Sequence, residues 1–305
     1  MIDFILLEEE RDREEKRRFY QSQIDGLRDV GLTARLLEFP EGAPVLPEGG
    51  GFAVFDVECR RHLRSRLDLM RLPHVPVIWN PYTFFEIGHM WIRHSDLVIA
   101  ALAPGPSSAQ LLRQYELSKP IEIINITAEY SALGGSAGQS RATSGIRRIG
   151  YFSESGIGLD FIRGVLTRRG HEHADLEWIP VSFESPSDWH RDLARCDILL
   201  SLRGLSGSAI PLLEAMASGV IVMGTHGGGL RDIAGPENGL WIESGTLETI
   251  AAEMAGGLKR MSAEPAWRRH LVEGAIEVSR QAGAEAVAAG NMEVWRRLAQ
   301  RASLV

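Results

Sequence analysis

The sequence predicts an α/β protein that consists of two successive halves, each built around a mostly parallel sheet. Short apolar segments without helical periodicity alternate with amphipathic segments along the chain, as in βα units. A polar stretch rich in Gly, Ser and Ala at residues 131–145 interrupts this alternation. The length of 305 residues is sufficient for two domains that each bury a core. Strands that alternate with helices are joined by crossovers, which favours a parallel sheet in each half.

The first half begins with an apolar strand at residues 2–7 and a charged amphipathic helix at residues 14–30. Four apolar residues of this helix are expected to face the core: Phe19, Tyr20, Ile24 and Leu27. Further strands are predicted at residues 32–39, 52–57, 76–79, 97–102 and 122–126. Helices are predicted between them at residues 59–72, 83–93 and 107–116.

A flexible linker is predicted at residues 133–145, because this stretch is Gly/Ser-rich and has no periodicity. It separates a first domain at residues 1–132 from a second domain at residues 146–305. In the second domain, strands and helices alternate from residue 148 to about 258, and residues 265–304 are helical by composition. The apolar faces of this tail are expected to contain Trp267, Trp295 and Leu298.

The composition is typical of a soluble globular protein, with 44% hydrophobic and 24% charged residues. A net charge of −7 argues against a nucleic-acid partner. Cys59 and Cys196 each adjoin an apolar run, so buried free thiols in a reducing compartment are expected. The N-terminus does not resemble a signal peptide, and no stretch approaches the roughly 20 apolar residues of a spanning helix. A cytoplasmic protein is therefore expected.

Residues 206–240 carry the strongest functional signal. A helix is predicted here with Ser206 or Ser208 as its N-cap, Pro211 in its first turn and Gly219 just after its end. Apolar strands flank this helix at residues 197–202 and 220–223. A strand, a small-residue loop and a helix N-terminus together form an anion site, because free N–H groups and the helix dipole point at the ligand.

Glu214 lies about one turn into this helix among apolar neighbours. A carboxylate in such surroundings is costly unless it accepts hydrogen bonds, and two vicinal ribose hydroxyls would supply the donors. The alternative is that Glu214 lies on the solvent side of the helix.

These residues resemble the donor-binding segment of the retaining GT-B glycosyltransferases with an E-x7-E motif (glycosyltransferase family 4-like). The resemblance runs from Cys196 through PLLEAMASG at residues 211–219 and GGL at residues 228–230 to NGL at residues 238–240. It implies a GT-B fold, in which two Rossmann-like domains with mostly parallel sheets face each other across a cleft and a final helix returns to the first domain. It also implies transfer of a hexose-like sugar, with retention, from a nucleoside-diphosphate sugar to a carbohydrate or small-molecule acceptor, without a metal or cofactor.

The resemblance implies a role for each matched position. Glu214 would bind the donor ribose, Ile210 would pack near the nucleoside, and the turn of Gly228 and Gly229 would lie at the donor. The backbone at three further positions would contact phosphates and sugar: Gly207, Ser208 and Ala209. Two positions near the transferred sugar are catalytic candidates, Asn80 and Ser206, although Ser206 stands where the family has the first Glu of its motif.

Residues 148–162 resemble the family's second marker, but Tyr151 replaces its Arg and Ile157 replaces its Lys. Those two cations neutralise the diphosphate in the family. The loop SESGIG at residues 153–158, with Gly156 and Gly158, could cradle phosphate through its N–H groups, or it is simply a tight strand–helix connection. Three arginines near in sequence are candidates for the missing charge: Arg147, Arg163 and Arg203.

Other residues carry weaker signals. Trp79 and Tyr82 either stack on an acceptor sugar or belong to the core, and His89 and His94 are interpreted as surface or packing residues. The chain lacks a complete G-x-G-x-x-G site, a P-loop, CxxC, HExxH, DxD and G-x-S-x-G. The alternative function is a non-catalytic GT-B-like protein that binds a nucleotide or a partner transferase, which the replacements at Ser206, Tyr151 and Ile157 favour.

Overall fold

The chain forms two compact units in the computed structural model. The structure describes residues 1–7, 13–39, 52–56, 77–80, 98–114, 119–125, 145–152, 156–169, 175–182, 185–202, 210–227, 229–242, 246–283 and 285–302. Of these, the first unit contains the residues up to 125 and those from 285 onward, and the second contains the residues between them. The predicted linker at 133–145 and the predicted helices at 59–72 and 83–93 lie outside the described residues.

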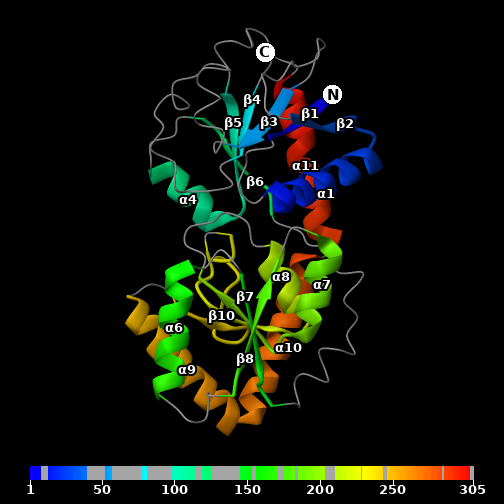
Figure 1. The fold of residues 1–305 in the computed structure, drawn as a ribbon. Helices are drawn as coiled ribbons and strands as arrows, with labels where there is room; N and C mark the ends of the chain where they lie inside the picture. Colours follow the sequence, from blue (N-terminus) through cyan, green and yellow to red (C-terminus); the bar gives the residue numbers. More distant parts are fainter. Residues whose placement is uncertain are drawn as a thin grey trace. The chain divides into compact units, whose positions relative to one another are not determined.

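The first unit contains a six-stranded parallel sheet in the order β2-β1-β3-β4-β5-β6. The strands are β1 (Ile2–Leu7), β2 (Ala34–Phe39), β3 (Phe52–Asp56), β4 (Val77–Asn80), β5 (Val98–Ala103) and β6 (Ile121–Ile123). Its described helices are α1 (Arg13–Asp29), α4 (Pro106–Gln114) and α11 (Glu285–Ala302) (Figure 1). All six predicted strands are confirmed, with bounds that differ by up to three residues.

The core of the first unit joins the start and the end of the chain. The predicted inner face of α1 is buried, and the ring of Tyr20 lies 5.2 Å from that of Phe4 on β1. On α11, Trp295 is fully buried, meets Phe4 edge-on at 5.2 Å and donates its indole N–H to Gln23 Oε1 at 3.0 Å. Helix α11 also packs on β5 and β6, so it is part of this unit's core.

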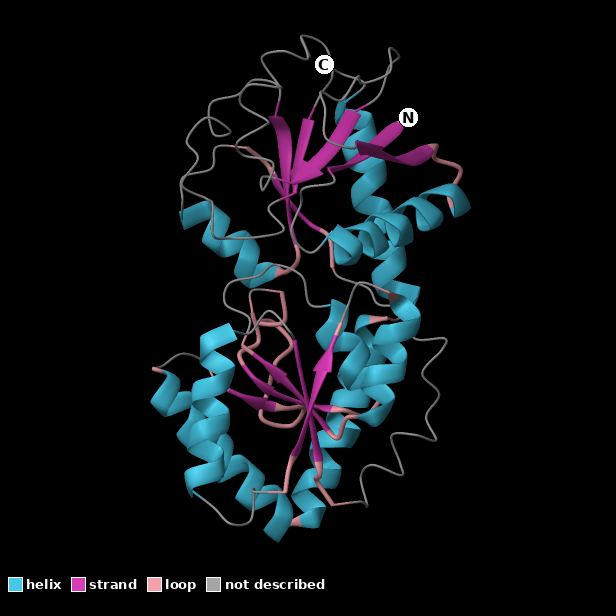
Figure 2. Cartoon of the chain, viewed as in Figure 1, coloured by secondary structure: helices cyan, strands magenta, loops and turns pink. Residues whose placement is uncertain are grey.

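The second unit contains a five-stranded parallel sheet in the order β11-β10-β9-β7-β8. The strands are β7 (Arg148–Phe152), β8 (Glu177–Val181), β9 (Ile198–Ser201), β10 (Ile221–Gly224) and β11 (Leu240–Trp241). Helices cover both faces of this sheet (Figures 1 and 2). One face is covered by α6 (Gly156–Arg169) and α9 (Leu247–Ala263), and the other by α7 (Pro186–Arg195), α8 (Ile210–Ala217) and α10 (Pro265–Ala282).

Helix α8 has Pro211 in its first turn and ends just before Gly219, as the sequence predicts, whereas the N-cap candidates Ser206 and Ser208 lie outside the described residues. Pro211 is its second residue, where a missing N–H leaves no hydrogen bond unmade. Gly219 follows the helix with φ of 72°, a conformation that favours glycine. The N–H groups of Gly219 and Val220 donate to the carbonyls of Met216 and Ala215, both at 2.9 Å, which closes the helix in a Schellman motif. Residues Ile210 to Met216 are all buried, so α8 has no solvent face.

A turn stabilised by Asn238 connects β10 to β11. The Oδ1 atom of this fully buried side chain accepts from the Gly235 N–H at 3.1 Å and the Trp241 indole at 2.7 Å, and its Nδ2 donates to Ile233 O at 2.7 Å. Helix α10 approaches this turn closely, because a Cβ atom on Gly274 would lie 2.1 Å from Glu237 O. Among the helices that the structure describes, none is both long and apolar enough to span a bilayer.

Candidate functional site

The strand order reverses beside β7 in the second unit. From β7 the chain moves to β8 on one side and then to β9, β10 and β11 on the other side. In open parallel sheets, ligands bind outside the carboxyl ends of the strands at such a switch point. Strands β7 and β9 are directly paired there, with Gly150 opposite Leu199 and Tyr151 opposite Leu200. The switch point therefore lies between the two segments, 148–162 and 197–219, on which the sequence prediction depends.

Two helix N-termini meet the carboxyl edge of β7 and β9. Helix α6 begins at Gly156 after β7, and α8 begins at Ile210 after β9. The two helices lie on opposite faces of the sheet. The first N–H groups of a helix have no partner within the helix, and the dipole makes this end positive. The edge is therefore suited to an anionic ligand such as a diphosphate.

Glu214 lies near this edge, one turn into α8, and is completely buried. Its Oε2 atom accepts a hydrogen bond from the indole Nε1 of Trp189 at 2.7 Å. The alternative that Glu214 is a solvated surface residue is therefore wrong. A buried carboxylate requires hydrogen-bond donors, and the indole of a neighbouring helix provides one.

Trp189 lies in the first half of α7 and is fully buried, with 0% of its surface accessible. Its ring is stacked on Phe152, the last residue of β7, at a centroid distance of 5.8 Å and an interplanar angle of 14°. The contact chain from Phe152 through Trp189 to Glu214 thus links β7, α7 and α8 directly beside the switch point. Sequence reasoning missed Trp189 and Phe152. The signal that could have revealed them is an aromatic residue at the end of β7 and another in the first half of α7, the second helix after it.

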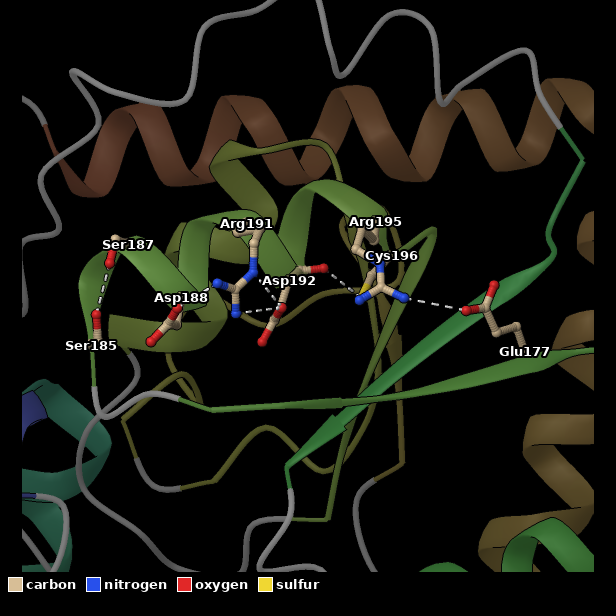
Figure 3. A network of polar contacts seen from close by, with 8 residues as sticks. All are labelled: Glu177, Ser185, Ser187, Asp188, Arg191, Asp192, Arg195 and Cys196. Carbon is tan, nitrogen blue, oxygen red and sulfur yellow. Dashed lines mark hydrogen bonds and ion pairs between the residues drawn. The ribbon is translucent and has the colours of Figure 1, made fainter.

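The outer face of α7 carries a network of polar contacts (Figure 3). Arg191 donates to Asp188 at 2.5 Å and to Asp192 at 3.3 Å, and the hydrogen bond to Asp188 raises the pKa of Arg191 above its ordinary value. The exposed ion pair between Arg191 and Asp188 contributes little to stability. On the buried side, Cys196 follows the helix and donates its thiol to Asp192 O at 3.1 Å. The prediction that Cys196 is a buried thiol outside a disulfide is confirmed, and Cys59 lies outside the described residues.

Hydrogen bonds between Ser201 and Thr225 connect the carboxyl ends of β9 and β10. The Thr225 N–H donates to Ser201 O, and Ser201 Oγ donates to Thr225 O, both at 2.8 Å. Gly224 has φ of 120°, and a Cβ atom there would lie 2.0 Å from Ser201 O, so only glycine fits. This close approach fixes the direction in which the chain leaves β10.

His226 and Gly227 follow at the same edge of the sheet. The half-buried His226 ring contacts Gly227 O through Nδ1, and Gly227 has φ of 62°. Sequence reasoning did not single out His226, although a polar residue directly after a buried parallel strand is a recognisable signal. Gly229 lies in the turn that follows, whereas Gly228 lies outside the described residues.

The structure places part of the predicted site. Ile210, Glu214, Gly156, Gly158 and Gly229 all belong to the second unit, and the first four lie in the opening turns of α6 and α8. Four predicted site residues of the loop after β9 lie outside the described residues: Ser206, Gly207, Ser208 and Ala209. Asn80 belongs to the first unit, where it is the last residue of β4 and pairs with Asp56 instead of following the strand.

The replacement at Tyr151 in the second marker is accounted for by packing. The Tyr151 ring lies 6.4 Å from that of Trp178 on β8, and the Arg163 guanidinium lies 5.5 Å from the Trp178 ring centroid. Arg163 is therefore engaged halfway along α6, not at its N-terminus. Arg147 precedes β7 and donates its backbone N–H to Asp197, at the amino edge of the sheet. The expectation that Arg147 supplies charge to the phosphate loop is wrong, and Arg203 lies outside the described residues.

Comparisons with known proteins agree with this topology. Residues 179–275 match the family described as "Glycosyl transferases group 1". No curated protein sequence matches the chain.

Solved structures match nearly the whole chain. A glycosyltransferase from Rickettsia africae has a TM-score of 0.66 at 10% identity, over 97% of this chain and 98% of its own. Sucrose-phosphate synthase from Thermosynechococcus elongatus has a TM-score of 0.66 at 11% identity, over 97% and 98%. HepE from Anabaena, in complex with UDP-glucose, has a TM-score of 0.64 at 12% identity, over 98% and 99%. At these identities the likeness establishes the fold, which is the α/β GT-B fold with mostly parallel sheets.

Proposed function

We propose that this protein is a glycosyltransferase that takes its sugar from a nucleoside-diphosphate sugar. The observation that carries the proposal is the buried Glu214 carboxylate beside the switch point, within the segment that matches the glycosyltransferase family. The GT-B fold supports it, as does the fact that the similar HepE structure contains UDP-glucose. The acceptor is a carbohydrate or a small molecule, and the transfer proceeds with retention, as the resemblance to the E-x7-E enzymes implies.

In this proposal the second unit binds the donor. Glu214 accepts hydrogen bonds from the ribose hydroxyls, and Ile210 packs near the nucleoside. The N-termini of α6 and α8, including Gly156 and Gly158, receive the diphosphate on backbone N–H groups. This arrangement needs no metal, because the dipoles of two helices and the free N–H groups stabilise the negative charge.

In the transfer step the bond between the anomeric carbon and the diphosphate oxygen breaks. The acceptor hydroxyl forms the new bond on the face that the diphosphate leaves, and its proton passes to the departing phosphate oxygen. The helix N-termini stabilise the charge that develops on this oxygen, which lowers the barrier to departure. Asn80 and Ser206 are proposed to contact the transferred sugar.

The first experiment is calorimetric titration of the full chain with UDP, GDP, TDP, ADP and CMP. We expect selective binding of one nucleotide, and a loss of about ten- to a hundredfold in affinity for Glu214→Ala, since a hydrogen bond to a charged group is worth about 1.5–3 kcal/mol. Glu253→Ala is the matched control, because Glu253 is an exposed carboxylate on α9 of the same unit. If wild type binds none of these nucleotides, or if Glu214→Ala binds as tightly as wild type, donor binding at this site is wrong.

A second candidate is a non-catalytic GT-B protein that binds a nucleotide or a partner transferase. The packing of Tyr151 on Trp178 favours it, because the position of the family's phosphate-binding Arg is occupied by an aromatic pair. The two candidates are separated by measuring sugar hydrolysis or transfer in wild type and in Ser206→Glu/Ile157→Lys. A gain in turnover in the double variant supports a degenerate site, whereas a loss supports an active enzyme with its own arrangement of residues.

A further inference from the structure

We propose that His226 is a specificity-determining residue that accepts a hydrogen bond from a hydroxyl group of the transferred sugar. The inference rests on the proposed function and deepens it, because it names a side chain of the second unit that distinguishes a nucleotide sugar from the nucleotide alone. The bond would form at Nε2 of the His226 ring.

His226 lies directly after β10, at the carboxyl edge of the sheet in the second unit. Strand β10 pairs with β9, and β9 pairs with β7, so two strand spacings separate His226 from β7 at the switch point. Neighbouring strands lie about 4.8 Å apart, which makes this separation about 10 Å along the sheet. A diphosphate with a hexose attached is longer than that. A donor whose diphosphate lies at the start of α6, after β7, can therefore extend its sugar to His226.

The backbone on both sides of His226 is held in place. On one side, the Thr225 N–H donates to Ser201 O and Ser201 Oγ donates to Thr225 O, both at 2.8 Å. On the other side, Gly227 is buried and has φ of 62°, a conformation that favours glycine. The His226 ring is therefore carried by a fixed part of the chain, which is the support that a group needs to recognise one particular hydroxyl.

The contact of the ring with Gly227 determines which nitrogen remains for a ligand. Nδ1 of His226 contacts Gly227 O. A carbonyl oxygen can only accept a hydrogen bond, so Nδ1 must carry the hydrogen. In the neutral imidazole the other nitrogen, Nε2, is then an acceptor. The two ring nitrogens point away from each other, so Nε2 is directed away from Gly227 O.

The chemistry of Nε2 selects a hydroxyl group over a phosphate. His226 is half-buried, so part of its ring is exposed, and no residue that the structure describes forms a hydrogen bond with Nε2. A hydroxyl group can donate to this nitrogen, whereas an ionised phosphate oxygen is itself only an acceptor. Of the parts of a nucleotide sugar that could lie here, the sugar is therefore the one that matches His226.

An acceptor at this place also answers a difference from the resembling family. Ser206 stands where that family has the first Glu of its motif, so a carboxylate acceptor near the transferred sugar is missing from this chain. His226 follows the strand that pairs with β9, and the segment that contains Ser206 comes directly after β9 in the sequence. Its Nε2 atom would supply an acceptor for the sugar from the neighbouring strand.

The test is a calorimetric comparison of a nucleoside diphosphate with its sugar conjugates on the full chain. The nucleotide is the one that wild type selects among UDP, GDP, TDP and ADP, and the conjugates are those of glucose, galactose, mannose and N-acetylglucosamine. His226→Phe keeps an aromatic ring but removes both nitrogens. We expect at least one conjugate to lose about five- to tenfold in affinity, while the affinity for the free nucleotide changes less than about twofold.

His270→Phe is the matched control, because His270 is an exposed histidine on α10 of the same unit. It is expected to change neither affinity. If no conjugate loses more affinity than the free nucleotide in His226→Phe, the inference is overturned and the proposed function remains intact. Absence of binding of every nucleotide and conjugate to wild type overturns the proposed function itself, so the two failures are distinguishable.

A second measurement examines the ring directly and covers the case in which His226→Phe does not fold. Wild type is labelled with ¹⁵N-histidine, and the ring nitrogens of His226 are observed by NMR in mildly alkaline buffer, where a free imidazole is neutral. We expect the hydrogen to be on Nδ1, and the Nε2 resonance to move much more on addition of the sugar conjugate than on addition of the free nucleotide. A hydrogen on Nε2, or equal shifts with both ligands, overturns the inference.

Discussion

Asn291 on α11 exchanges two hydrogen bonds with the backbone of Asn125, which lies 166 residues earlier in the chain. Asn291 Nδ2 donates to Asn125 O at 2.8 Å, and the Asn125 N–H donates to Asn291 Oδ1 at 3.0 Å. The side chain of Asn291 is fully buried. The Asn291 amide thus pairs with both backbone groups of Asn125, as a neighbouring strand would do.

Asn291→Ala is expected to destabilise the first unit by about 1–3 kcal/mol, because it removes both hydrogen bonds between the buried Asn291 amide and the Asn125 backbone. Chemical denaturation followed by circular dichroism measures this loss. Arg296→Ala is the control on the same helix, since Arg296 makes only an exposed ion pair with Glu293 at 3.4 Å. Equal stability of the two variants would show that the amide pair contributes nothing.

Two helix glycines are expected to respond in opposite directions to the same substitution. Gly256 is exposed in the middle of α9, and a Cβ atom there has no heavy atom within 4 Å. Gly256→Ala should stabilise the protein by about 0.5–1 kcal/mol through helix propensity. Gly274→Ala in α10 should destabilise it by about 1–3 kcal/mol, because its Cβ would lie 2.1 Å from the Glu237 carbonyl oxygen. Thermal denaturation of the pair tests the close approach of α10 to the turn; a gain in both variants contradicts it.

Gly150 and Cys196 are expected to be energetically coupled. A Cβ atom on Gly150 would lie 2.6 Å from Cys196 Sγ, so Gly150→Ala should cost about 1–3 kcal/mol. Cys196→Ala removes the sulfur, and the double variant should regain part of the loss. A double-mutant cycle measured by urea denaturation should give a coupling free energy above about 0.5 kcal/mol. Strict additivity would mean that the clash is relieved elsewhere, for example by Val181, whose Cγ1 atom lies 3.3 Å from the same position.

Thr246 caps the N-terminus of α9, and its removal should cost about 1 kcal/mol at neutral pH. The Thr246 hydroxyl also hydrogen-bonds the Glu248 carboxylate, and this bond, with that of the Glu248 backbone, lowers the pKa of Glu248. A lowered pKa in the folded state gives a stabilisation that is present above the unfolded value of 4.5 and is lost as the pH falls through the folded value. The difference in melting temperature between wild type and Thr246→Ala should therefore shrink below pH 4.5.

Ser262→Ala on the same helix is the control for this pH dependence. Ser262 Oγ donates to Leu258 O at 3.0 Å within the helix and does not cap it. Its removal should change stability little and equally at all pH values. A pH-independent effect of Thr246→Ala would show that the Glu248 contact does not contribute.

The fold class could be predicted from the sequence because it depends on local patterns of apolar residues. Apolar runs predict the strands because the inner strands of a parallel sheet are buried on both faces, as the fully buried β9 and β10 show. The end of α8, and the place of Pro211 in its first turn, were predictable because Pro211 and Gly219 act through backbone conformation alone. Such signals depend on neighbours in sequence and are visible without the tertiary structure.

The site was only partly predictable because its contacts are long-range. The sequence leaves open whether Glu214 is solvated, since the deciding contact is with Trp189 on another helix, 25 residues earlier. Arg147 is close in sequence to the loop after β7, which was predicted to bind phosphate. It lies at the opposite edge of the sheet, because the whole of β7 runs between Arg147 and that loop. Distance along the chain is thus a poor guide to charge placement in a parallel sheet, where each strand carries the chain from one edge to the other.

The place of α11 in the first unit has a consequence for synthesis on the ribosome. The described residues of the second unit all lie between residues 145 and 283, and no described residue of the first unit lies among them, whereas the first unit needs the segment that follows. Trp295 and Asn291 leave the exit tunnel after all the strands of both sheets. The second unit can therefore acquire its core during translation, while the strands that were made first must wait for the last helix. Truncated or stalled chains would expose the apolar surface of the first unit around Phe4, and cellular quality control would encounter this unit as the vulnerable one.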